Sequence, residues 1–168
     1  AGGKVEFIFS NRPSASEIYD SITHLDVEAS IKRMDSAGTV NLFVKRQVFE
    51  NIGFFEDSVR SGADMQFTNK AVLSGYKLVF ARDAIVFHPT RAFKELIKKS
   101  YRVGIGIVDV MTARGIKAHD VILRTLKNFL PPSPFTLSKK LNEKTDNRLN
   151  KNFISIISVA YLCKITKG

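Results

Sequence analysis

The fold is decided by residues 38–91, which read GTVNLFVKRQVFENIGFFEDSVRSGADMQFTNKAVLSGYKLVFARDAIVFHPTR. Short apolar runs at its two ends are typical of strands, and the stretches between them have helical spacing. Glycine separates the elements, and Gly75 is placed as a natural helix C-cap. The pattern predicts a strand over 40–44, a short helix over 45–52, a helix over 62–74, and two strands, 78–80 and 84–87, around a turn at Arg82 and Asp83. This alternation indicates an α/β fold.

The segment before this stretch continues the mixed pattern. Residues 4–9 alternate between polar and apolar, which predicts a strand. Ser14 or Ser16 can cap the following helix, with Glu17 in its first turn. Its apolar stripe predicts one helix that ends at residues 35–38; the stripe consists of Ile18, Ile22, Leu25, Ala29 and Ile31.

The segment after Pro89 is helical and basic. A long helix is predicted over 92–114, and a second apolar stripe over 122–130 is flanked by Arg124 and Lys127. The prolines of 131–134 form a stiff break, and 138–151 is polar and basic. The final apolar run, 153–163, would span only about 16 Å as a helix, whereas roughly 20 residues are needed to cross a bilayer.

Composition narrows the possible partners. The 168 residues, 44% of them apolar, suit one compact domain or part of a larger one. The net charge of +10 is uneven: 89–168 contains 16 Lys and Arg against 5 Asp and Glu, whereas 1–88 is nearly balanced. This basic half requires an anionic partner, either membrane phosphates or nucleic acid. The single Cys163 excludes an internal disulfide and a cysteine-based zinc site, and indicates a reducing compartment.

Asp64 is the candidate catalytic carboxylate. It follows Gly62 and Ala63 at the predicted start of a helix, where the helix dipole favours an ionised carboxylate. The two small residues leave room for a substrate. Asp64 can therefore act as a general base toward an acceptor hydroxyl. Taken alone, it can equally be a helix cap.

Three further residues can act as ligands of a substrate or a metal. His88 ends a strand and can hold a divalent metal or contact a phosphate. Asn41 enters a strand, where its amide can orient a ligand, and Arg91 can reach a phosphate. Each also has a structural reading: a packed histidine, an amide that ties a loop, and a solvated arginine. His24 and His119 are assigned no role.

Several common motifs are absent from the sequence. It contains neither G-x-x-x-x-G-K-[ST] nor G-x-S-x-G, and its only G-x-G, at 104–106, lies inside a helical pattern. No closely spaced carboxylate pair such as D-x-D precedes Asp64. The sequence therefore gives no phosphate-binding loop of its own.

Taken together and in order, these motifs resemble the C-terminal half of family 2 glycosyltransferases, which are inverting and use nucleotide sugars. The resemblance covers residues 1 to about 106 and is strongest at 39–55 (TVNLFVKRQVFENIGFF), 61–67 (SGADMQF), 75–84 (GYKLVFARDA) and 88–91 (HPTR).

The resemblance implies a Rossmann-like, glycosyltransferase A-type domain of which this chain contributes the acceptor half. It implies that Asp64 is the base and that His88 lies near a metal and the diphosphate leaving group. Asn41, Gly62, Ala63 and Arg91 are predicted from the residues themselves to bind substrate. Three positions depart from the pattern, namely Ala63, Gln66 and Lys70, and they affect the acceptor specificity that can be inferred.

The sequence thus predicts an acceptor-side catalytic half at 1–91 and a basic, amphipathic, membrane-associating region at 92–168. The predicted function is transfer of a sugar from a nucleotide sugar to a polysaccharide or lipid-linked acceptor. The donor-binding half and its D-x-D are expected to lie outside the chain, so that the chain alone is an inactive fragment. The full-length enzyme is expected to use Mg²⁺ or Mn²⁺ and to lie in the cytoplasm, peripheral to the inner face of the cell membrane. The alternative is a non-enzymatic basic module, either a degenerate partner subunit or a nucleic-acid-binding domain.

Overall fold

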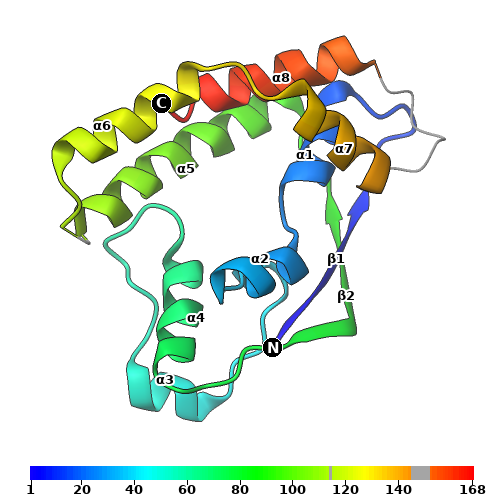
Figure 1. Cartoon of the computed structure of the whole chain (residues 1–168). Coiled ribbons are helices and arrows are strands. Elements are labelled where there is room, and N and C mark those ends of the chain that lie inside the picture. Colours follow the sequence, from blue (N-terminus) through cyan, green and yellow to red (C-terminus); the bar gives the residue numbers. More distant parts are fainter. Residues whose placement is uncertain (114, 145–151) are drawn as a thin grey trace. The chain divides into compact units, whose positions relative to one another are not determined.

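The structure, a computed structural model, describes residues 1–113, 115–144 and 152–168. It has a mixed α/β composition with a two-stranded sheet (Figure 1). The elements, in chain order, are β1 (Gly2–Ile8), α1 (Ala15–Thr23), α2 (Val27–Met34), the 3-10 helix η1 (Thr39–Asn41), α3 (Arg46–Ile52), α4 (Ala63–Leu73), β2 (Phe80–Pro89), α5 (Phe93–Ala113), α6 (Ala118–Leu126), the 3-10 helix η2 (Lys127–Phe129), α7 (Pro134–Lys144) and α8 (Phe153–Ile165).

The chain divides into two compact units. The strand unit comprises Ala1–Phe7 and Leu25–His88, and the helical unit comprises Ile8–His24 and Pro89–Gly168. Residues 8–24, which contain α1, thus pack with the C-terminal part of the chain. The two units meet in the sequence at His88 and Pro89, near the boundary predicted at residue 91. The sequence pattern did not predict that α1 packs with the C-terminal part of the chain.

The two strands of the sheet run parallel. The Gly2 amide donates to the Val79 carbonyl at 2.9 Å, and further along both strands the carbonyls of Lys4 and Ala84 accept from one side chain. The prediction of two strands around a turn at Arg82 and Asp83 is wrong, because β2 is continuous from Phe80 to Pro89. This strand pairs with β1.

The strand predicted at 40–44 is also wrong. Residues 39–41 form η1, and Leu42 makes only an isolated antiparallel bridge to Gly2. The tight 3-10 turn places the Asn41 side chain against both strands of the sheet. An extended chain over the same residues would point this side chain in a different direction.

The single helix predicted over 14–34 is split into α1 and α2. Ser14 begins α1 with a capping box that includes Glu17, as predicted. The chain leaves α1 at His24, takes a left-handed conformation at Leu25 (φ 57°), and restarts when the Asp26 carboxylate accepts from the Ala29 amide at 3.0 Å. This side-chain cap competes with continuation of the helix, so the apolar stripe is divided between the two units.

The remaining helix predictions for the strand unit are confirmed. α3 ends at Gly53 (φ 86°) and α4 begins after Gly62 (φ 93°), and both glycines have a backbone conformation that side chains oppose. The two helices are joined by a cluster of aromatic rings in which Phe49 stacks on Phe67, with centroids 4.9 Å apart. Phe54 and Phe55 pack on the same ring, Phe49.

The helical unit is built around α8, which packs against α1 and α5 (Figure 1). Its apolar residues surround the helix on all sides, as expected for a central element. Burial of each large core side chain contributes about 1.5–3 kcal/mol. The core consists of Ile18, Tyr19, Ile22, Leu96, Leu137, Leu141, Ile156, Ala160 and Cys163. None of the helices in the described residues is both long enough and apolar enough to cross a membrane.

Candidate functional site

Asp64 lies in the first turn of α4, in the strand unit. Its Oδ2 accepts from the Thr39 amide at 2.8 Å and from Thr39 Oγ1 at 3.2 Å, and its Oδ1 accepts from the Met65 amide at 2.9 Å. Gly62, in the left-handed conformation, turns the chain into the helix, and a Cβ there would meet no other atom within 4 Å. The carboxylate is half-buried and is held by donors from two separate segments.

A second residue of α4 fixes the segment that reaches Asp64. Thr68 Oγ1 accepts from the Ala37 amide at 2.9 Å and donates to carbonyls nearby, including that of Asp64. A Cβ on Gly38 would lie 3.3 Å from Asp64 Oδ2, so the segment passes close to the carboxylate. Ala37 and Thr39 are therefore bonded to two residues of α4, Thr68 and Asp64, that lie one helical turn apart.

The geometry allows Asp64 to be both a structural tie and a base. A carboxylate has about four acceptor positions, and three are used by the bonds above, two of them on Oδ2. Within the described part of the chain, Oδ1 thus keeps an acceptor position for a substrate hydroxyl.

Asn41 is committed to the sheet. It is 5% exposed, and its Nδ2 donates to the Lys4 carbonyl at 2.9 Å and to the Ala84 carbonyl at 2.8 Å. Gly3 makes room for it, since a Cβ at Gly3 would overlap the Asn41 amide. Both amide hydrogens of Asn41 are therefore used to join β1 to β2. The predicted binding of substrate by Asn41 stays a prediction, and it would have to be made by the amide oxygen.

His88 lies near the end of β2, on the same face as Ala84 and Val86, and is half-buried. Its ring meets that of Phe7 edge-on, with centroids 6.1 Å apart. His88 is four residues beyond Ala84, which corresponds to roughly 13 Å of strand.

The residues present do not by themselves fit a divalent metal. A site for such a metal takes several oxygen or nitrogen ligands. Within residues 1–113, 115–144 and 152–168, no three His, Cys, Asp or Glu side chains gather as such a ligand set. A metal near His88 would thus need ligands from outside these residues, and no chemical step is assigned to a metal here.

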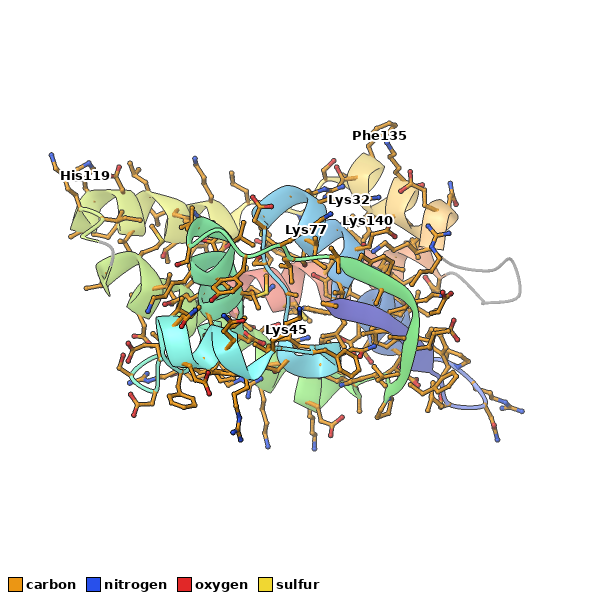
Figure 2. The ribbon with its side chains drawn as sticks, turned by 90° about the horizontal axis from the view of Figure 1, so that it is seen from below. Lys32, Lys45, Lys77, His119, Phe135 and Lys140 are labelled. Atoms are coloured by element: carbon orange, nitrogen blue, oxygen red, sulfur yellow. The ribbon has the colours of Figure 1, made fainter. Side chains whose placement is uncertain are left out.

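An apolar pocket of about 400 Å³ borders α4 on another side. Val48, Phe67 and Thr68 line it together with Lys45 and Lys77, both of which are labelled in Figure 2. Asp64 is not among its lining residues. The pocket therefore does not place an acceptor at the candidate base.

Arg91 lies in the helical unit and is bound to Asp20. Its backbone amide donates to Asp20 Oδ2 at 3.0 Å, and its Nη1 lies 3.1 Å from both carboxylate oxygens. Asp20 is fully buried. The structure thus gives Arg91 a structural partner that the sequence did not indicate, and its predicted contact with a substrate phosphate stays a prediction.

Asp20 is the centre of a charged cluster that sequence reasoning missed. His24 Nδ1 lies 2.9 Å from Asp20 Oδ1, and Lys99 Nζ lies 3.9 Å from the same oxygen. Burial alone would raise the pKa of Asp20, but the hydrogen bond from His24 and the charges of Arg91 and Lys99 outweigh it and hold this pKa below its usual value. The i, i+4 spacing of Asp20 and His24 was the signal available in the sequence.

Lys99 is the weak member of this cluster, because one carboxylate faces several cations. Burial, followed by the charge of Arg91, lowers the pKa of Lys99 to about 8 from 10.5. Between these two values the unfolded chain binds more protons at this residue than the folded chain does. The contribution of Lys99 to stability therefore rises as the pH increases from about 8 to 10.5.

We expect Lys99→Met to be more stable than the wild type at pH 7, by about 1–3 kcal/mol, because burial of the ammonium is avoided. The advantage should shrink as the pH rises from about 8 toward 10.5, because the folded-state lysine is then already neutral while the unfolded-state lysine is losing its proton. Urea unfolding of both proteins between pH 7 and 10 measures this difference. A constant difference across the range would contradict the explanation.

Fold and site together define a mixed α/β protein whose strand unit contains the candidate base Asp64 in the first turn of α4. The chain is similar to a protein named glycosyltransferase AglE from Haloferax volcanii, with 39% identity over 170 residues. The match covers 99% of this chain and 56% of that protein, so the chain spans little more than half the length of its relative. No family model matches the chain, and no solved structure matches it.

Proposed function

We propose that the full-length protein is a glycosyltransferase and that the strand unit provides the acceptor side of its active site. The similarity to a protein named a glycosyltransferase, over nearly the whole of this chain, supports glycosyl transfer. The position of Asp64 at the start of α4, with acceptor capacity left on Oδ1, supports a base at this place. The geometry of Asp64 is the observation that carries the assignment of its role.

In the proposed reaction, Asp64 takes the proton of an acceptor hydroxyl while that oxygen attacks the anomeric carbon of a nucleotide sugar. The bond from the sugar to the diphosphate breaks in the same in-line displacement, which inverts the anomeric centre. The bonds from Thr39 hold the carboxylate in one orientation, so that Oδ1 faces the acceptor. This is the chemistry of the inverting family 2 enzymes, in a Rossmann-like domain whose donor half would lie outside the chain.

The function is tested by supplying the full-length protein with radiolabelled nucleotide sugars, Mg²⁺ or Mn²⁺, and an extract of lipid-linked and polysaccharide acceptors. Label that moves into the acceptor fraction supports the proposal. Release of free sugar without transfer would contradict a transferase function, and binding of nucleic acid with no turnover of any donor would favour the non-enzymatic alternative.

We further propose that the helical unit binds the anionic surface of the cytoplasmic membrane. α6 has no buried residue, and its apolar side chains are widely exposed: Ile122 is 58% exposed, and Leu123 and Leu126 are each 55% exposed. Arg124 and Lys127 flank this apolar face. Apolar side chains bordered by cations are typical of helices that lie in a membrane interface.

Leu126→Asp is expected to weaken binding of the protein to vesicles that contain phosphatidylglycerol by about tenfold or more, because a carboxylate replaces an inserted apolar side chain. Co-sedimentation with vesicles measures the binding, which high salt should also reverse. The whole chain must be used, since α1 supplies Ile18 and Ile22 to the core of the helical unit. Leu73→Asp, in α4 and 80% exposed, is the matched control. Equal losses in both variants would contradict a specific role of α6.

A further inference from the structure

A basic pocket lies within the helical unit, apart from the residues assigned to glycosyl transfer. It has a volume of about 230 Å³ and is formed by α1, the segment from η2 to α7, and the end of α8. Three lysines line it, namely Lys140 of α7, Lys164 of α8 and Lys167 just after α8. Figure 2 labels Lys140 on α7.

The charge of the pocket is one-sided. Among the described residues, no Asp or Glu lines it. Lys164 Nζ donates to the Leu130 carbonyl at 2.8 Å, which fixes its position and leaves further N–H donors. Burial lowers the pKa of Lys167, because the charged ammonium loses contact with water. A bound anion would offset this loss of solvation. The position of Lys167 is set by close packing, since a Cβ on Gly104 of α5 would lie 2.6 Å from the Lys167 carbonyl oxygen.

Neutral donors complete the lining. Thr23, Ser133 and Thr136 contribute hydroxyl groups, and Asn128 contributes an amide. Ser133 immediately precedes α7 and accepts from the Thr136 amide in the first turn of this 11-residue helix, where the helix dipole favours negative charge. Cations and hydroxyl donors around a small space are the groups that recognise phosphate oxygens.

We propose that this pocket binds a phosphate group, as inorganic phosphate or as the terminal phosphate of a larger molecule. Its volume is below the roughly 300–1,000 Å³ of pockets that enclose drug-sized molecules, so it suits one compact anion. The lysines neutralise the dianion, and the hydroxyls donate to its remaining oxygens. The proposal does not depend on glycosyl transfer, because none of these residues belongs to the strand unit.

The source of the phosphate can be soluble or a lipid headgroup. Phe135 lies between Ser133 and Thr136 in the sequence, is 81% exposed, and projects from α7 in Figure 2. Leu130, whose carbonyl holds Lys164, is 61% exposed. These apolar side chains next to the pocket could contact an acyl chain attached to the phosphate.

Isothermal titration of the whole chain with inorganic phosphate and with dioctanoyl phosphatidic acid tests the pocket. Lys167→Gln is expected to weaken binding of the phosphate ligand by about tenfold or more, the usual effect of losing one charge-assisted hydrogen bond. Lys140→Gln should weaken it in the same direction. Lys139→Gln is the matched control: it neighbours Lys140 on α7 but does not line the pocket, and it lies 3.9 Å from Glu143.

Tighter binding of the phosphatidic acid than of inorganic phosphate identifies a headgroup as the source, and equal affinities identify phosphate alone; either result supports the pocket. No saturable binding of either ligand, or equal losses in Lys167→Gln and Lys139→Gln, would overturn it. Circular dichroism of each variant shows whether the fold is kept. If Lys167→Gln does not fold, Lys140→Gln on α7 provides the same test. Asp64→Asn should leave phosphate binding unchanged, so failure of the pocket and failure of the proposed function give different results.

Discussion

Replacement of Asp64 by asparagine is expected to lower the rate of glycosyl transfer by a factor of about 10²–10⁴, the range lost with a general base. Asparagine has nearly the same shape and can keep an oxygen toward the Thr39 amide and hydroxyl. Its amide nitrogen then replaces Oδ1, which accepts from the Met65 amide. The variant therefore keeps the tie to Thr39 but has no group able to take a proton.

The control for this experiment is Asp57→Asn, which changes an exposed carboxylate in the loop before α4. It should transfer sugar at the wild-type rate. Affinity for the nucleotide sugar should be unchanged in both variants, because Asp64 is placed on the acceptor side. If Asp64→Asn retains full activity, or loses donor binding together with transfer, Asp64 is a structural residue and not the base.

Replacement of Asp20 by alanine should be the most destabilising of the substitutions considered. The carboxylate is fully buried, and its removal leaves the cations of Arg91 and Lys99 without their shared partner. Breaking a buried ion pair in this way typically costs about 3–5 kcal/mol of unfolding free energy, because an uncompensated charge is left behind. Urea unfolding at pH 7 measures the loss, and Asp83→Ala, on the exposed part of β2, should change stability by less than about 0.5 kcal/mol.

The pH dependence of this effect has a definite sign. The pKa of Asp20 lies below its usual value of 3.8 in the folded state, so the folded chain binds fewer protons there than the unfolded chain does. The stability from Asp20 is therefore present above pH 3.8 and is lost as the pH falls through the folded-state pKa. The difference in unfolding free energy between the wild type and Asp20→Asn should therefore become smaller as the pH falls through this acidic range. A gap that stays constant down to pH 2 would contradict the ion-pair explanation.

The sequence predicted best those elements whose ends carry a local signal. Gly53 ends α3 and Gly62 begins α4, as glycines at left-handed positions do, and Ser14 with Glu17 begins α1. The long α5 also follows its apolar periodicity. These features depend on neighbouring residues, so they can be read without knowledge of the tertiary structure.

The errors occurred where distant contacts decide the conformation. Residues 40–44 look extended, but Asn41 bonds to both strands of the sheet from a 3-10 turn. The stripe from Ile18 to Ile31 looks like one helix, but it is broken at Leu25 and its halves pack in different units. Local periodicity contains no information on which unit a segment joins.

The candidate site shows the same division. The place of Asp64 at a helix start followed from Gly62 and Ala63, whereas its bonds to Thr39, 25 residues earlier, did not. The pairing of Arg91 with Asp20, 71 residues apart, had no local signal either. Asp64 could thus be identified from the sequence as a candidate. The bonding partners of Asp64 and of Arg91 could be identified only from the folded structure.

The measurement that tests the central claim most directly is the anomeric configuration of the product, read by proton NMR after transfer from a nucleotide sugar of known configuration. With Asp64 as the base of a single in-line displacement, the full-length protein should form a product of inverted configuration. A product with retained configuration, or turnover of the donor without any transfer, would contradict this account.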